Sequence, residues 1–278
     1  MNNQPIIRKA SGEAEPFSQE KLEASLRRAG AGEETISEIA GDIKSWLTDG
    51  ESTKNIYSRA FRLLRKKRSS LAARYKLKKA IMELGPSGYP FEHFIGQIMK
   101  NQGFEVQTGL VVEGNCITHE MDVIATKDSV QRLVECKFRN SQGKISSVQV
   151  PLYVRSRVDD IIKKRKTLPE FQGLDFQGWL VTNTRFSLDA IQYGTCSGLN
   201  MLSWDHPQKN GLKDLIERDL IFPITTLVNL TKKQKVMLAQ KGIVLCRQLL
   251  ESKEEVALLG LTVSKQKELE EELEELCS

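Results

Sequence analysis

The sequence predicts an α/β protein in three parts, in which a mixed sheet core flanked by helices stands between two mostly helical segments. Between residues 86 and 221, short apolar runs typical of strands alternate with stretches of helical periodicity. On both sides of this segment the apolar residues recur mainly at helical spacing. Turn-forming residues in Gly85–Pro90 and at Pro223 separate the three patterns. We therefore expect domains at residues 1–85, 86–221 and 222–278.

The first segment is predicted to be a short strand followed by helices. The strand covers Ile6–Lys9 and ends in a turn at residues 10–12. Ser18 and Ser52 are residues of the N-cap type, and each precedes an amphipathic pattern. A basic helix over residues 71–84 is expected to close the segment.

The middle segment is predicted to begin with a helix near Pro90, because proline favours the first helical turn. Helices are also expected at residues 151–166 and 187–196. The expected strands lie at residues 104–106, 119–125, 132–138, 178–182 and 200–204. Beyond Pro223, apolar residues at helical spacing predict several short helices.

The composition is that of a globular protein. Of the 278 residues, 40% are hydrophobic and 28% are charged, which excludes a disordered or collagen-like chain. The apolar runs are far shorter than the ~18 residues of a membrane helix, and the polar N-terminus predicts no secretory signal. The five cysteines are widely spaced and form no Cys-x-x-Cys pair. We expect a cytoplasmic protein without disulfides, zinc knuckles or membrane contact.

Positive charge is concentrated in the first segment. The chain has a net charge of +5, and nine Lys and Arg occur between Arg62 and Lys79 without a single acid. Such a stretch predicts binding of phosphate, in nucleic acid or in a nucleotide. A solvated helix face explains the same charges equally well.

The residues with the clearest chemical meaning lie in two strand-like runs on either side of a turn-prone link. If residues 128 and 129 form the tip of a hairpin, Asp122 lies directly opposite Glu135. Their Cβ atoms would then be ~4.5–5.5 Å apart on one face of the sheet. Lys137 is two residues beyond Glu135 and therefore shares that face.

Two opposed carboxylates destabilise a sheet, and a divalent cation between them removes the repulsion. A Mg²⁺ ion held by Asp122 and Glu135 would supply the nucleophile, while Lys137 would stabilise charge developing on a phosphate. The pattern therefore predicts metal-assisted phosphodiester hydrolysis. The alternative is an exposed ion pair between Glu120 and Lys137, with Asp122 as an ordinary surface residue.

Several short motifs across residues 86–206 occur in a recognisable order. They are Phe91-Glu92 at the start of a helix, Asn101–Val106, Met121–Ala125, Leu133–Lys137 and Gly178–Asn183. Together they resemble the catalytic core of the PD-(D/E)xK nucleases and, within them, the Mrr-like restriction endonucleases.

This resemblance implies a restriction-endonuclease-like fold and a Mg²⁺-dependent DNA endonuclease of restriction or repair. It implies that Asp122 and Glu135 are metal ligands and that Lys137 is the catalytic base or charge stabiliser. Glu92 would be an auxiliary acid and Gln149 a further site residue. The alternatives are that Glu92 only complements the helix dipole and that Gln149 is structural. Because one such site cuts one strand, we expect a homodimer for double-strand cleavage.

The first segment has a resemblance of its own. Ile6–Lys9, Glu15–Phe17, Glu20–Leu22 and Arg27–Ala29 are similar to motifs of the ATP-cone, a nucleotide-sensing module. The resemblance implies binding of ATP or dATP, with Lys9, Lys21 and Thr53 near the phosphates or the base. Ala10 follows Lys9 where the family often has a second cation, so the alternative is a retained fold that no longer binds nucleotide.

The last segment weakly resembles helix-hairpin-helix modules, which bind DNA phosphates; a helical cap or dimerisation element is the alternative. The main alternative for the whole protein is a nucleotide-responsive DNA-binding regulator without cleavage activity. The combination of Asp122, Glu135 and Lys137 favours the nuclease, because a protein that only binds DNA does not need it.

Overall fold

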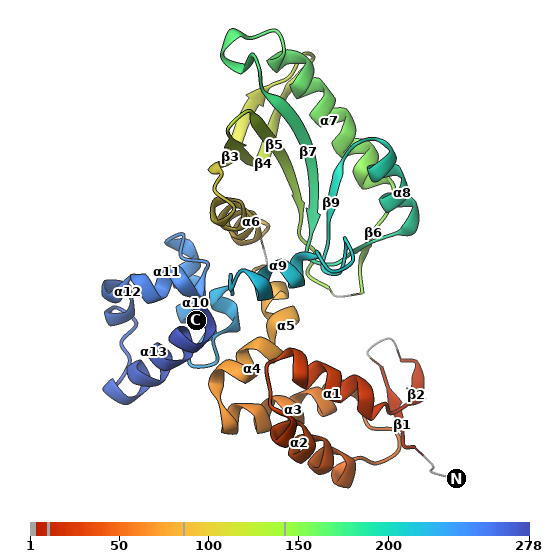
Figure 1. Ribbon diagram of the computed structural model, residues 1–278, viewed down its shortest axis with the longest axis vertical. Helices are drawn as coiled ribbons and strands as arrows, with labels where there is room; N and C mark the ends of the chain where they lie inside the picture. The colour runs from red at the N-terminus through yellow and green to blue at the C-terminus, as the bar shows by residue number, and fades with distance from the viewer. Residues whose placement is uncertain (1–3, 10–11, 86, 142) are drawn as a thin grey trace.

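The computed structural model describes residues 4–9, 12–85, 87–141 and 143–278 (Figure 1). A mixed sheet with its helices forms one end of the molecule, and the N-terminal and C-terminal helices form two lobes at the other end. In the described part of the chain, no helix has the length and apolar character needed to cross a membrane.

The N-terminal lobe begins with an antiparallel strand pair, β1 (Ile6–Arg8) and β2 (Ala14–Pro16). The predicted turn between them starts at residues 10 and 11, which lie outside the described residues. Three helices follow, α1 (Gln19–Arg28), α2 (Glu33–Trp46) and α3 (Thr53–Lys67). The predicted caps are confirmed, because Ser18 and Ser52 each accept a backbone N–H three residues ahead.

The single basic helix predicted for residues 71–84 is wrong. The structure has two short helices, α4 (Ser69–Tyr75) and α5 (Leu77–Met82), that meet at Lys76. Lys76 Nζ donates to the carbonyl oxygen of Thr225 at 2.9 Å, and Thr225 Oγ1 donates to Ala80 O at 2.8 Å. These contacts bind α5 to a part of the chain about half its length away, which helical periodicity does not reveal.

The central sheet has the order β3-β4-β5-β7-β9. Strand β4 (Thr118–Lys127) runs antiparallel to both of its neighbours, β3 (Glu105–Glu113) and β5 (Val130–Lys137). Strands β7 (Asp175–Thr182) and β9 (Asn200–Leu202) run parallel to β5. The sequence indicated only the beginning of β3, which continues seven residues beyond the predicted end at Val106.

Helices cover both faces of the sheet, as Figure 1 shows. Helix α6 (Tyr89–Asn101) packs its Phe91 and Ile98 against Val123 and Val134 on one face. Helices α7 (Gln149–Arg165) and α8 (Leu188–Cys196) cover the other face. The α/β class and the predicted order of strands and helices in this segment agree with the structure.

The remaining elements are short. Strands β6 (Ile145–Ser146) and β8 (Arg185–Phe186) form a small parallel pair, and 3₁₀ turns occur at η1 (Pro169–Phe171) and η2 (Ile224–Thr226). The other helices are α9 (Leu212–Arg218), α10 (Lys232–Gln240), α11 (Cys246–Glu251), α12 (Lys253–Ala257) and α13 (Val263–Cys277). The C-terminal helices share one buried apolar cluster with α6 and its face of the sheet. Their apolar residues thus stabilise the middle segment directly.

Candidate active site

The β4–β5 hairpin has the predicted register. Val123 lies opposite Val134, as expected for a tip at residues 128 and 129. Asp128 at that tip has a positive φ of 51°, a conformation that aspartate adopts more readily than most residues. The hairpin therefore carries Asp122, the next residue of β4, toward Glu135 on β5.

Just before the site, the side chains of paired residues in β3 and β4 switch from one face of the sheet to the other. Thr108 and Val123 are partners and face α6, whereas Leu110 and Met121, the next pair along the ladder, face α7. In a regular strand, residues two apart face the same side. Gly109 lies between these pairs with a φ of 64°, which glycine adopts without steric cost. A lone glycine within a strand pattern is the signal by which the sequence could have revealed this irregularity.

The change of face turns the Asp122 side chain toward the neighbouring strand. Its Oδ2 accepts a hydrogen bond from Cys136 N at 2.6 Å, in place of a backbone partner from β4. Burial raises the pKa of Asp122 to about 6, and the charge of Glu135 adds to this effect. The two predicted metal ligands therefore lie close enough to repel each other.

Glu135 is buried, with 3% of its surface exposed, and two cations neutralise it. Lys137 Nζ lies 2.6 Å from Glu135 Oε1, which confirms that these two residues share a face. Arg157 of α7 lies 2.6 Å from Oε2, and its other terminal nitrogen donates to Glu120 O. Local sequence patterns do not reveal this contact of Arg157, because it depends on how α7 packs against the sheet.

Glu92 joins the group from the first turn of α6. Its carboxylate bends back over Gly88, where a Cβ would lie only 2.6 Å from Glu92 Oε1. The pKa of Glu92 is raised to about 7. Burial is the main cause, and the negative charges of Asp122, Glu120 and Glu135 raise this pKa further. Glu92 therefore lies within electrostatic range of the carboxylates on β4 and β5.

Two of these carboxylates, those of Asp122 and Glu135, are the residues that could hold a magnesium ion. Within the described ranges, no group of three His, Cys, Asp or Glu side chains could hold a metal ion. Mg²⁺ nevertheless needs only one or two protein carboxylates, with water and phosphate oxygens as its other ligands. Asp122 and Glu135 fit that requirement, and their mutual repulsion is relieved by a cation. To bind the ion, Glu135 would have to give up its ion pair with Lys137 or with Arg157.

The remaining predicted nuclease residue is not brought into this group. Gln149 is the first residue of α7 and is exposed. In the described part of the chain, its side chain makes no hydrogen bond to Asp122, Glu135 or Lys137. His119 of β4 contacts Asp160 of α7 at 2.8 Å and so connects this end of the β3–β4 pair to that helix.

The predicted nucleotide residues lie around the N-terminal strand pair. Lys9 and Lys21 both approach Glu15, at 2.8 and 3.6 Å. Lys9 also contacts Glu13 at 3.1 Å. Thr53 begins α3 next to this strand pair, since the adjacent Ser52 bridges β1. The structure thus brings Lys9, Lys21 and Thr53 to one end of the lobe, with acids already pairing the two lysines.

The fold and site define an α/β protein with a five-stranded mixed sheet and a charged group on its central hairpin. Comparison with known proteins then assigns a family. A protein of Archaeoglobus fulgidus, described as uncharacterized, is 32% identical over 176 residues, covering 63% of this chain and 95% of the relative. The AF1548-like C-terminal family matches residues 222–277. This chain belongs to the AF1548-like family.

Two solved structures resemble this one. The crystal structure of AF1548, described as a protein of unknown function, is 30% identical with a TM-score of 0.56, and the match covers 69% of this chain and 98% of that one. The restriction endonuclease MspJI in complex with an oligonucleotide is 15% identical with a TM-score of 0.31, over 72% of this chain and 38% of that one. The second likeness is too low to support any conclusion about function.

Proposed function

We propose that the protein is a Mg²⁺-dependent endonuclease that hydrolyses DNA phosphodiester bonds and has a restriction-endonuclease-like core. The observation that carries the proposal is the juxtaposition of Asp122 with the pair formed by Glu135 and Lys137 at the end of the hairpin. Carboxylates that repel one another beside an ammonium are what a site for a cation and a phosphate requires.

Each side chain has a distinct role in this proposal. Asp122 and Glu135 would hold Mg²⁺, which supplies an activated water and polarises the phosphate. When substrate binds, Lys137 leaves its ion pair with Glu135 and contacts the scissile phosphate. There it stabilises the negative charge that develops on the phosphate. Glu92, with a pKa of about 7, can accept or release a proton near neutral pH. Arg157 orients Glu135 through its ion pair.

The test is cleavage of supercoiled plasmid with Mg²⁺. Wild type is expected to nick DNA, and Lys137→Ala should lower the rate by about 100-fold or more, the usual effect of removing such a stabilising group. Lys44→Ala is the matched control, because Lys44 is exposed near the end of α2. Branched, single-stranded and methylated substrates would separate repair from restriction. Cleavage of both duplex strands only by a dimer would support the proposed homodimer.

A second candidate function is a DNA-binding regulator without cleavage activity. One observation favours it, because Lys137 and Arg157 each pair with one carboxylate oxygen of Glu135. Duplex binding without nicking, identical in wild type and Lys137→Ala at every Mg²⁺ and nucleotide concentration, would select the regulator.

We further propose that ATP or dATP binds at Lys9, Lys21 and Thr53 as an effector. The side chains support it by their position, whereas the pairing of both lysines with Glu15 opposes it. Titration of labelled ATP and dATP should show weaker binding to the Lys9→Ala/Lys21→Ala variant than to wild type. Equal or absent binding in both proteins would remove the nucleotide from the function.

A further inference from the structure

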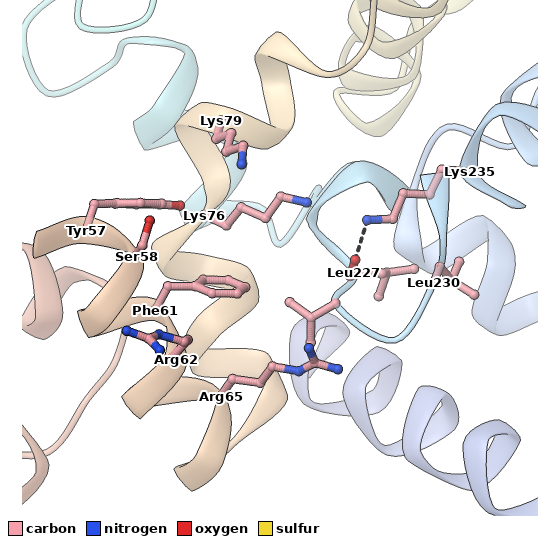
Figure 2. Close-up of a pocket in the computed structure, with 11 residues that line it drawn as sticks. Tyr57, Ser58, Phe61, Arg62, Arg65, Lys76, Lys79, Leu227, Leu230 and Lys235 are labelled. Carbon is pink, nitrogen blue, oxygen red and sulfur yellow. Dashed lines mark hydrogen bonds between the residues drawn. The ribbon is translucent and has the colours of Figure 1, made fainter. Parts of the chain in front are cut away.

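A separate cavity of about 350 Å³ lies between the N-terminal lobe and the C-terminal segment (Figure 2). Helix α3 forms one wall, α5 with the preceding Lys76 forms a second, and the loop and helix around residues 227–235 form a third. None of the residues in the proposed active site or the proposed nucleotide site lines this cavity. Three parts of the chain that are distant in sequence thus line it.

Positive charge dominates the lining. Five of its eleven residues are cations, namely Arg62, Arg65, Lys76, Lys79 and Lys235. Over the residues that the structure describes, the ion pairs of these five involve a single carboxylate, Glu83, which lies 2.9 Å from Lys76 and 3.9 Å from Lys79. The cavity therefore has a large excess of positive charge that a bound anion would neutralise.

Lys235 is the most enclosed of these cations, with 8% of its surface exposed. Its Nζ donates to Thr225 O at 3.1 Å and to Leu227 O, a contact visible in Figure 2. Burial lowers the pKa of Lys235 to about 8, and the charge of Lys76 lowers it further. A buried ammonium held only by carbonyl oxygens gains stability when an anion comes close.

An unsatisfied hydroxyl is a second, independent indication of a ligand. Tyr57 Oη is buried, and none of the residues that the structure describes forms a hydrogen bond with it; Figure 2 shows it directed toward Lys76. Buried polar groups are nearly always hydrogen-bonded, so each exception calls for a missing partner. The Tyr57 ring stacks on Tyr75 at 5.0 Å and on Phe61 at 6.4 Å. These two stacking contacts hold the ring, and with it the hydroxyl, in place.

We propose that this cavity binds a small ligand with two or more linked phosphates. Closely spaced phosphate oxygens match the several cations and the free tyrosine hydroxyl at once. The size favours a compact molecule, because about 350 Å³ is at the lower end of the 300–1,000 Å³ range typical of small-molecule pockets. Phe61, Leu227 and Leu230 add apolar surface to the lining.

Calorimetric titration of the full chain with inorganic triphosphate tests the proposal. We expect saturable binding, weakened at least about tenfold, or by 1.4 kcal/mol, in Arg62→Ala/Arg65→Ala. The control Lys54→Ala/Lys66→Ala removes the same charge from exposed positions of α3 outside the cavity and should change affinity less than about twofold. Tyr57→Phe should weaken binding without loss of folding, and Lys137→Ala should bind like wild type.

Three outcomes would overturn the proposal. The first is absence of triphosphate binding to wild type. The second is an equal loss of affinity in the two double variants, which would indicate only a diffuse basic surface. The third is binding of a short single-stranded oligonucleotide, with triphosphate unable to compete, which would assign the cavity to nucleic acid. Nuclease activity is not needed for any of these measurements, so they are independent of the proposed cleavage.

Discussion

Asp122→Asn should stabilise the protein at pH 8 while abolishing any cleavage. The pKa of Asp122 is about 6 against an ordinary 3.8, a difference of about 2 units or about 3 kcal/mol. Because the folded-state pKa is raised, folding favours the protonated form, and stability is lost as pH rises from about 4 through 6. Asparagine removes the charge and keeps an oxygen that can accept the Cys136 N–H. We expect a gain of about 1–3 kcal/mol, since neighbouring charges can rearrange.

Urea denaturation without divalent cations measures this difference. At pH 4 the gain should shrink below about 1 kcal/mol, because the folded wild type is then protonated. Added Mg²⁺ should stabilise wild type and leave Asp122→Asn unchanged. Asp160→Asn is the matched control of opposite sign, since a hydrogen bond from His119 lowers the pKa of Asp160 to about 2. That variant should lose stability at pH 8. An Asp122→Asn protein that is less stable than wild type at both pH values would refute the repulsion.

Three further substitutions test the contacts around the site and between the lobes, each by urea denaturation at pH 8. Arg157→Met should cost about 3–5 kcal/mol, because it leaves the buried Glu135 with one cation; a neutral effect would mean that the pair is dispensable. Gly178→Ala should cost about 1–3 kcal/mol, since its Cβ would lie 2.7 Å from Leu199 Cδ2; unchanged stability would show that the leucine moves freely. Glu272→Ala should cost about 1–3 kcal/mol, because this carboxylate accepts two backbone N–H groups before α10; a loss below about 0.5 kcal/mol would contradict that role.

Local sequence patterns determined the elements whose cause is local. The cap at Ser18 depends on a hydrogen bond to a residue three positions away. The two-residue tip of the β4–β5 hairpin fixes its register, and the register places Asp122 toward Glu135. Period-2 geometry alone places Lys137 beside Glu135. Such features extend over a few residues, so the sequence alone specifies them.

Tertiary packing decided the features that join distant parts of the chain. Gly109 and its β4 partner strand together change the face of the sheet, which a single strand pattern cannot show. Arg157 reaches Glu135 only because α7 packs across β5. The basic cavity depends on α5 meeting the segment around Thr225. Periodicity reports which face of an element is apolar, whereas the partner that covers that face is chosen by long-range contacts. The sequence by itself therefore determined the charged hairpin, and the packing of the helices decided which cations surround it.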